Sequence, residues 1–160
     1  DLTYVVRRVL TAARLRCLAD ALWPELGPSL DDAVSPFIRL ALQHAAAPLD
    51  LPRLAAALGI HRKTLWERCR QRGIPSPREL LSWCRLLAAA FVLDDDGRTV
   101  DSVAVELDFP SPSALRNLLQ RYTQLTPSAL RARGGSSYAV RLLSSRLRSS
   151  IPLRRAINGP

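Results

Sequence analysis

The sequence predicts an all-α protein of small packed helices. Three observations favour this fold class: helix-start signals recur along the chain, glycines follow the helical runs, and strand-like alternation of apolar and polar residues is rare. Several connections are only three to five residues long, so consecutive helices should pack together. We predict helices at 3–23, 31–46, 51–58, 62–72, 77–93, 100–107, 112–123 and 127–132.

The first predicted helix, 3–23, is amphipathic and belongs to a segment, 1–28, that we interpret as a linker or the remnant of an upstream domain. Two roles remain open for this helix. It could pack on the rest of the chain, or it could serve in dimerisation or signal coupling. The central predicted domain spans 29–133. Residues 134–160 follow as a basic tail, for which disorder and a short helix on Val140, Leu143 and Leu147 are both open.

Within the central domain, the clearest helix starts combine a side-chain oxygen with a proline. The oxygen accepts a hydrogen bond from a free amide of the first turn, and proline fits there because it has no amide. The predicted starts are Asp50-Leu51-Pro52, the capping box Ser76-Pro77-Arg78-Glu79, Ser111-Pro112 and Thr126-Pro127. The predicted stops are Gly59, Gly73, Gly97 and the pair Gly134-Gly135.

The charge of the chain lies in its last third. Of the formal charge of +9, residues 1–108 contribute nothing, because 14 acids balance 14 basic residues, whereas 109–160 hold nine arginines and no acid. A basic end of this kind favours nucleic acid or another anionic surface as partner, the alternative being a solvated tail. No apolar run reaches the ~18 residues of a membrane span, and no secretory signal is present, so we predict no membrane partner.

Enzymatic and metal sites are not indicated. The three cysteines, at 17, 69 and 84, fall in apolar helical patterns and are predicted as core residues of a reducing compartment. His44 has no partner of suitable spacing, and the run Asp94-Asp95-Asp96-Gly97 lacks the later glutamate of a calcium loop. We therefore predict no catalytic residue, no metal and no cofactor.

An internal repeat organises the central domain. LAAALGIHRKTLWERC (54–69) and VAVELDFPSPSALRNLL (103–119) share an aliphatic-alanine pair, a Gly or Asp at the turn, and a second helix with a leucine at the same place. A short helix, a tight turn and a longer helix, used twice, predict two helix-turn-helix units.

The second helix of each unit has an apolar and a polar face. At about 100° per residue, His61, Leu65, Arg68, Cys69 and Arg72 share one side of the first, and Ser111, Leu115, Leu118, Leu119 and Tyr122 share one side of the second. The opposite sides hold Lys63, Trp66, Glu67 and Arg70, and Ser113, Arg116, Asn117 and Gln120. Such side chains read base edges, although an ordinary solvated face is the alternative. Tryptophan is rare on a solvated face, so we expect Trp66 to be exposed for contact.

With these residues the chain resembles the DNA-binding domain of the AraC/XylS transcriptional regulators over about 31–133. The matching residues are Leu54-Ala55, Gly59, Leu65, Pro77, Arg85-Leu86, Ala89, Val92-Leu93, Thr99-Val100, Val103-Ala104, Phe109, Ser113, Leu115, Leu119, Thr126-Pro127 and Arg131. The family's pattern has glycine where this chain has Asp108 and Gln124, an arginine at Asn117, and aromatic residues at Cys69 and Leu130. Asp108 can still adopt a left-handed conformation.

The resemblance implies two homeodomain-like three-helix units joined by one long helix, 77–93. Two recognition helices, 62–72 and 112–123, would enter successive major grooves of double-stranded DNA. By position, the family's base-contacting sites fall on Arg62, Lys63, Trp66, Glu67, Pro112, Ser113, Arg116 and Asn117. Contacts with the DNA backbone are predicted at His61, Arg70, Gln120 and Arg121. The tail arginines 141, 146, 148, 154 and 155 could add further phosphate contacts.

The predicted function is therefore sequence-specific transcription regulation in the bacterial cytoplasm, at the nucleoid. Further candidate partners are RNA polymerase and a second copy of the chain, bound through residues 1–28 or through an amino-terminal domain outside this sequence. Two alternatives remain open at this point: a degenerate helix-turn-helix module that binds protein through the Trp66 face, and a non-specific nucleic-acid binder.

Overall fold

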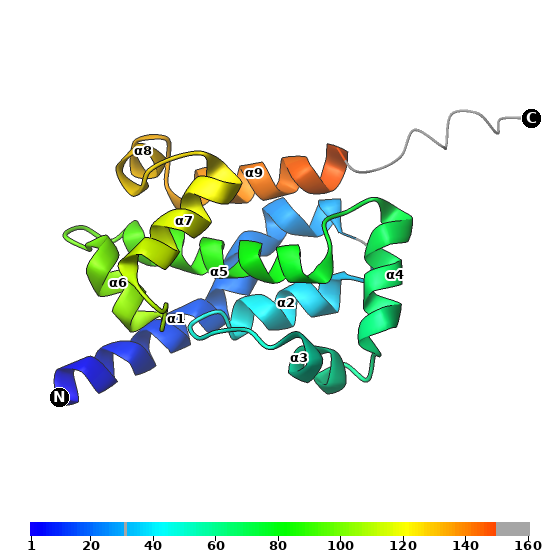
Figure 1. Ribbon diagram of the computed structural model, residues 1–160, viewed down its shortest axis with the longest axis horizontal. Helices are drawn as coiled ribbons and strands as arrows, with labels where there is room; N and C mark the ends of the chain where they lie inside the picture. Colours follow the sequence, from blue (N-terminus) through cyan, green and yellow to red (C-terminus); the bar gives the residue numbers. More distant parts are fainter. Residues whose placement is uncertain (31, 150–160) are drawn as a thin grey trace, which may run out of the picture.

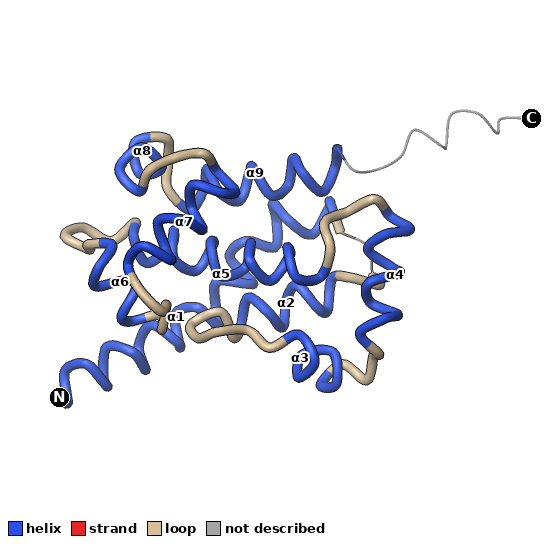
Figure 2. Tube along the Cα trace, in the orientation of Figure 1, coloured by secondary structure: helices blue, strands red, loops and turns tan. Residues whose placement is uncertain are grey.

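The computed structural model describes residues 1–30 and 32–149 as helices joined by short connections (Figure 1). Figure 2 shows no strand in this part of the chain, and the all-α prediction is confirmed. None of the helices described there is both long enough and apolar enough to cross a bilayer. The elements are α1 (Leu2–Leu26), η1 (Gly27–Ser29), α2 (Ser35–Gln43), α3 (Leu51–Ala57), α4 (Arg62–Arg72), α5 (Pro77–Leu93), α6 (Val100–Glu106), α7 (Pro112–Thr123), α8 (Pro127–Ala132) and α9 (Ser136–Ser149).

The central helix is α5. Of its 17 residues, 13 are buried, so the apolar surface of this helix must be covered from several directions. All the other α-helices contact it (Figure 1). Its start has one half of the predicted capping box: Ser76 Oγ accepts a hydrogen bond from the amide of Glu79 at 3.3 Å. The long connecting helix is therefore the core of the molecule as well as the link between its two halves.

The two helix-turn-helix units lie in order along the chain. In the first unit α3 packs against both α2 and α4, and in the second α7 packs against both α6 and α8. The predicted architecture of two three-helix units joined by a long helix is confirmed. The six helices from α3 to α8 also begin at the predicted residues, and each ends within one residue of the predicted position.

Of the two alternatives left open after residue 134, the structure has the helix: residues 136–149 form α9. Three of its residues, Val140, Leu143 and Leu147, are at most 2% exposed. They occupy one face of the helix because of their spacing, and α5 and α1 cover that face. Ser144 Oγ also donates a hydrogen bond to the Glu25 carbonyl at 3.3 Å. The predicted contacts of the arginines at 154 and 155 lie outside the described residues.

The start of α9 depends on the acidic run that ends α5. The amide of Ser136 donates to Asp94 Oδ1 at 3.1 Å, so Asp94 caps a helix that begins 42 residues later. Gly135 has φ +61°, and a Cβ there would overlap the Asp94 carboxylate. This position therefore needs glycine both for its backbone angle and for space.

Three other expectations were wrong in detail. The helix predicted at 31–46 begins at Ser35, because Pro36 fits only in a first turn and would break a helix interior. The first helix continues past 23 to Leu26, whose side chain is fully buried and holds the last turn in place. Cys17 is exposed, since it lies on the side of α1 opposite the core, whereas Cys69 and Cys84 are buried as predicted.

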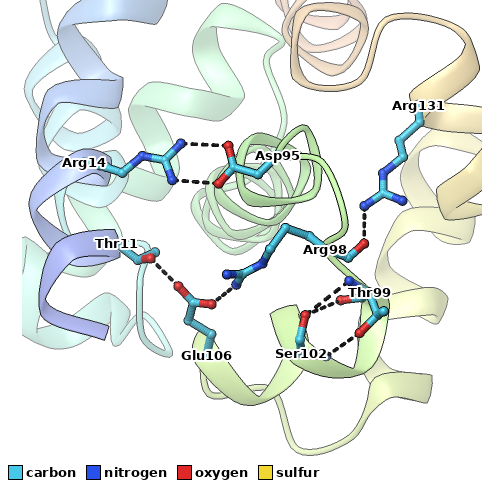
Figure 3. A network of polar contacts seen from close by, with 8 residues as sticks. All are labelled: Thr11, Arg14, Asp95, Arg98, Thr99, Ser102, Glu106 and Arg131. Carbon is cyan, nitrogen blue, oxygen red and sulfur yellow. Dashed lines mark hydrogen bonds and ion pairs between the residues drawn. The ribbon is translucent and has the colours of Figure 1, made fainter. Parts of the chain in front are cut away.

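A polar network joins α1 to the second unit (Figure 3). Thr11 donates a hydrogen bond to one carboxylate oxygen of Glu106, and Arg98 forms an ion pair with the other. Glu106 is only 4% exposed, so these two partners compensate a buried charge. Nearby, the guanidinium of Arg14 meets both oxygens of Asp95 at 2.7 and 3.0 Å. The first helix is thus attached to the second unit by charged groups as well as by apolar packing.

Candidate nucleic-acid interface

The two units turn in the same way. In each turn one residue has a left-handed backbone, Gly59 with φ 65° and Asp108 with φ 57°. The amide of the next residue then donates to a carbonyl at the end of the preceding helix. The donor–acceptor pairs are Ile60–Ala55 at 2.9 Å and Phe109–Ala104 at 2.8 Å. The prediction that Asp108 takes the place of a turn glycine is confirmed, and the internal repeat is a repeat of backbone geometry.

Side chains cap the second helix of each unit. His61 Nδ1 accepts a hydrogen bond from the amide of Lys63 at 3.2 Å, and Ser111 Oγ accepts one from the amide of Ala114 at 3.0 Å. Because Nδ1 of His61 is an acceptor, its proton must sit on Nε2, which remains able to donate outward. The cap that His61 forms is therefore compatible with the predicted contact to an anion.

The outer face of α4 carries the predicted polar set. Leu65 and Cys69 face the core, and burial raises the pKa of the Cys69 thiol to about 11. Trp66 is 50% exposed, and the guanidinium of Arg70 lies 5.5 Å from the centre of its ring. The expectation that Trp66 is outside the core is confirmed. The other predicted members, Arg62, Lys63 and Glu67, are exposed or partly exposed on the same helix.

The outer face of α7 is polar as well. Leu115 and Leu119 are buried, and the predicted contact residues Ser113, Arg116, Asn117, Gln120 and Arg121 are exposed, with Pro112 partly exposed. Arg116 lies 3.6 Å from Asp101 of α6. Both side chains of this pair are more than half exposed, so water screens it and it contributes little. Arg116 can therefore exchange this partner for another acceptor at low cost.

The structure does not gather these residues into one site. In Figure 1, α4 and α7 lie toward opposite ends of α5, with α4 near its start. Around the start of α4, however, His61, Arg62, Lys63 and Trp66 line a common hollow of about 330 Å³. The first turn of α5 supplies a further residue to it, Arg78, which is exposed. Arg78 was predicted only as part of the capping box at 76–79, and its position at that helix start is the sequence signal that could have placed it here.

One buried arginine holds both units against α5. Arg85 is 8% exposed and donates to the carbonyls of Ala45 at 2.7 Å and Leu107 at 2.6 Å. Its guanidinium also stacks 4.2 Å from the ring centre of Phe109. Burial lowers the pKa of Arg85 to about 10, against an opposing effect of the Asp108 carboxylate. The carbonyl of Ala45 precedes α3 and that of Leu107 ends α6, so Arg85 fixes a point of each unit relative to the other.

Between the units lies a groove of about 620 Å³. Its walls come from the start of α3, the middle of α5, the second turn and α7, and Asp50, Arg78, Arg85 and Asp108 are its charged residues. On the far side, Arg131 of α8 donates from Nε to the Leu93 carbonyl at 2.7 Å and so attaches the second unit to the end of α5. Neither arginine contact was predicted, because from the sequence Arg85 and Arg131 are only points of family resemblance.

Comparison with known proteins adds one finding. A family model described as "Helix-turn-helix domain" matches residues 54–133. The matched span begins in α3, ends just after α8, and contains both turns and every residue of the two units predicted to contact DNA; the tail arginines lie outside it. No curated protein and no solved structure matches the chain.

Proposed function

We propose, from the premise that this chain belongs to the AraC-type helix-turn-helix family of DNA-binding transcription regulators, that both of its units read base sequence. The observation that carries the proposal is the repeated turn geometry, followed in each unit by a helix with a polar outer face. The matched family is one of DNA-binding regulators and not of enzymes. Such a regulator works where the chromosome is, so we place it in the bacterial cytoplasm.

The chemistry of the two faces supports base reading. On α4, Arg62 and Lys63 suit the acceptors of guanine, and Glu67 suits the amino group of cytosine. On α7, Arg116 suits guanine, and Asn117 can bond adenine through both its amide donor and its carbonyl. Ser113 adds a hydroxyl, while Pro112 and Trp66 add apolar surface for thymine methyl groups or sugars. Together the faces offer partners for all four bases.

Phosphate contacts would position these helices. The groups suited to them are His61, Arg70 and Arg78 in the first unit and Gln120 and Arg121 in the second. His61 would donate through Nε2, which its capping role leaves available. Such contacts fix the register of a protein on the duplex without selecting a sequence.

We further propose that α4 and α7 enter successive major grooves. Each helix presents its polar face from a different end of α5, and Arg85 and Arg131 fix the units on that helix. Successive grooves on one face of B-DNA are about 34 Å apart, and bending of the duplex brings them closer. The bound site would then be bipartite, with half-sites roughly ten base pairs apart.

The test begins with selection of bound duplexes from a random pool. The selected duplex and a scrambled duplex are then titrated by fluorescence anisotropy at two salt concentrations. We expect a bipartite motif and an affinity for it far above that for the scramble. The variant Arg116→Ala should lose about 1–3 kcal/mol of discrimination at one or two base pairs of the motif. Arg16→Ala, which removes an exposed arginine of α1, is the matched control and should leave the discrimination unchanged.

Other outcomes point to the alternatives. If affinity follows only salt and no motif emerges, the chain binds nucleic acid non-specifically. If no duplex is bound at all, the Trp66 face is a protein-binding surface. An equal loss on selected and scrambled DNA in Arg116→Ala would remove this residue from the base-reading set and place it with the phosphate contacts.

A further inference from the structure

The large apolar residues exposed to solvent are concentrated at one end of the molecule. Eight such residues occur in the described part of the chain, and six of them lie among the first ten positions. They are Leu2, Tyr4, Val5, Val6, Val9 and Leu10, with exposed fractions between 38% and 78%. A cluster of exposed apolar residues indicates a contact surface, whereas apolar residues scattered singly over a surface do not.

All of these residues except Tyr4 form a face of α1 distinct from its core face. The core face consists of Thr11, Leu15, Leu18 and Ala19, which are buried. Positions 2, 5, 6, 9 and 10 follow the i, i+3, i+4, i+7, i+8 spacing of an apolar helical stripe, and at about 100° per residue this stripe lies opposite the core face. In Figure 1 this end of α1 extends beyond the other helices, so no other part of the described chain covers it.

A groove of about 510 Å³ runs along one border of the stripe. One side of it is apolar and consists of Leu2, Val6 and Leu10. The other side is cationic and consists of Arg7 and Arg14 of α1 and Arg98 from the loop before α6. Val5 and Val9 belong to the stripe but do not line the groove.

The charge of this surface is strongly one-sided. Residues 2–19 include four arginines, at 7, 8, 14 and 16, and no acidic residue. Arg14 is paired with Asp95 and Arg98 with Glu106, whereas no ion pair is formed by Arg7 within the described residues. Burial, together with the neighbouring Arg7 and Arg14, lowers the pKa of Arg98. The groove thus has a cationic excess as well as an apolar wall.

We propose that this groove binds an acidic amphipathic helix of a partner protein. Its apolar residues would cover Leu2, Val6 and Leu10, and its carboxylates would meet Arg7 and the exposed edge of Arg14. A second copy of the chain fits less well, because it would bring Arg7 and Arg14 of one copy against the same cationic groove of the other and like charges repel. Binding of a helix along an apolar groove is a common mode of recognition, and here the flanking arginines select the charge of the guest. This interaction is separate from DNA binding, since no residue assigned to DNA lines the groove.

The test uses a defined probe. It is a fluorescein-labelled helical peptide about five turns long, with leucines at every third or fourth position and glutamates elsewhere, titrated by anisotropy with the whole chain. A second probe replaces each glutamate with lysine. We expect saturable binding of the acidic probe and at least tenfold weaker binding of the basic one.

Two pairs of variants locate the site. Val6→Ser should weaken binding of the acidic probe about tenfold, and Val5→Ser should change it less than threefold, because the two valines are 47% and 53% exposed but only Val6 lines the groove. Arg7→Glu should likewise weaken it about tenfold and Arg16→Glu less than threefold, since Arg16 is exposed outside the groove. Circular dichroism checks that all four variants keep the helical content of the parent.

Several results would overturn the proposal. The first is that the acidic probe does not bind. The second is that both variants of a pair, Val6→Ser and Val5→Ser or Arg7→Glu and Arg16→Glu, lose the same affinity for it. Sedimentation equilibrium of the protein alone must show a monomer, because a dimer dissociated by Val6→Ser would make a second copy the occupant. Binding to phosphatidylglycerol vesicles that is lost in Val6→Ser, without binding of the peptide, would make the surface a membrane contact instead.

Discussion

Replacement of Arg85 offers a direct test of how the two units are held together. This side chain is almost fully buried, and its two shortest hydrogen bonds go to the carbonyls of Ala45 and Leu107. These carbonyls belong to segments 62 residues apart, so no local structure can substitute for the guanidinium that joins them. Arg85→Met keeps an unbranched apolar stem but removes the guanidinium, so both carbonyls lose their donor.

The size of the effect follows from these contacts. A buried acceptor left without a donor costs about 1–3 kcal/mol, and two are affected. The stack on Phe109 contributes about 0.5–2 kcal/mol more. Burial disfavours the Arg85 cation, as its lowered pKa shows. Removing this charge therefore offsets part of the loss in the free energy of unfolding. We expect Arg85→Met to lower the free energy of unfolding by about 3 kcal/mol, and Arg85→Lys, which can satisfy one carbonyl, by roughly half as much.

Urea unfolding followed by far-ultraviolet circular dichroism measures this difference. The matched control is Arg78→Met on the same helix, because Arg78 is exposed and its loss should change the free energy of unfolding by less than about 0.5 kcal/mol. If Arg85→Met unfolds within that margin of the parent protein, the two carbonyls do not depend on the guanidinium. The description of Arg85 as the link between the units would then be wrong.

Three further predictions concern other parts of the molecule. Gly135→Ala should lower the midpoint of thermal unfolding by several degrees, because a Cβ there overlaps the Asp94 carboxylate that caps α9; an unchanged midpoint would contradict this. A thiol reagent at pH 8 should modify Cys17 alone in the native protein and all three cysteines in guanidinium, whereas fast reaction of more than one native thiol would mean that the interior opens readily. Asp95→Asn should cost at most about 1 kcal/mol at pH 7, since its ion pair with Arg14 is largely exposed. That ion pair lowers the pKa of Asp95, so the difference from the parent should disappear as the pH falls below 3.8 and through the lower pKa of the folded protein; a difference that persists under acid would exclude this cause.

The sequence predicted the helices best where their ends are set by local chemistry. From Asp50 to Arg133, capping side chains, first-turn prolines and left-handed residues determine each boundary, and the predictions there hold to within one residue. Outside this span the signals were weaker. The serines after Gly134-Gly135 suggested a flexible joint, but three apolar residues further on are enough to hold α9 once α1 and α5 provide a surface. That surface exists only in the tertiary structure.

The same distinction applies to the candidate interface. Helical periodicity predicted which side chains of α4 and α7 point outward, because the spacing of Leu65–Cys69 and Leu115–Leu119 determines the buried side. It could not predict the neighbours supplied by other helices, such as Arg78 beside the start of α4. Nor could it predict that Arg85 and Glu106 are buried, since their partners come from segments that are distant in the sequence.

The position of α9 also restricts when a newly made molecule can finish folding. The hydrogen bond between Ser144 and the Glu25 carbonyl joins positions 119 residues apart. At a synthesis rate of about 5–20 residues per second, roughly 6–24 s separate the emergence of these two positions from the ribosome. Both helix-turn-helix units are synthesised during that interval, and the faces of α1 and α5 that α9 covers remain open until its end. Nascent chains of this regulator should therefore remain susceptible to chaperones and proteases until α9 has been synthesised.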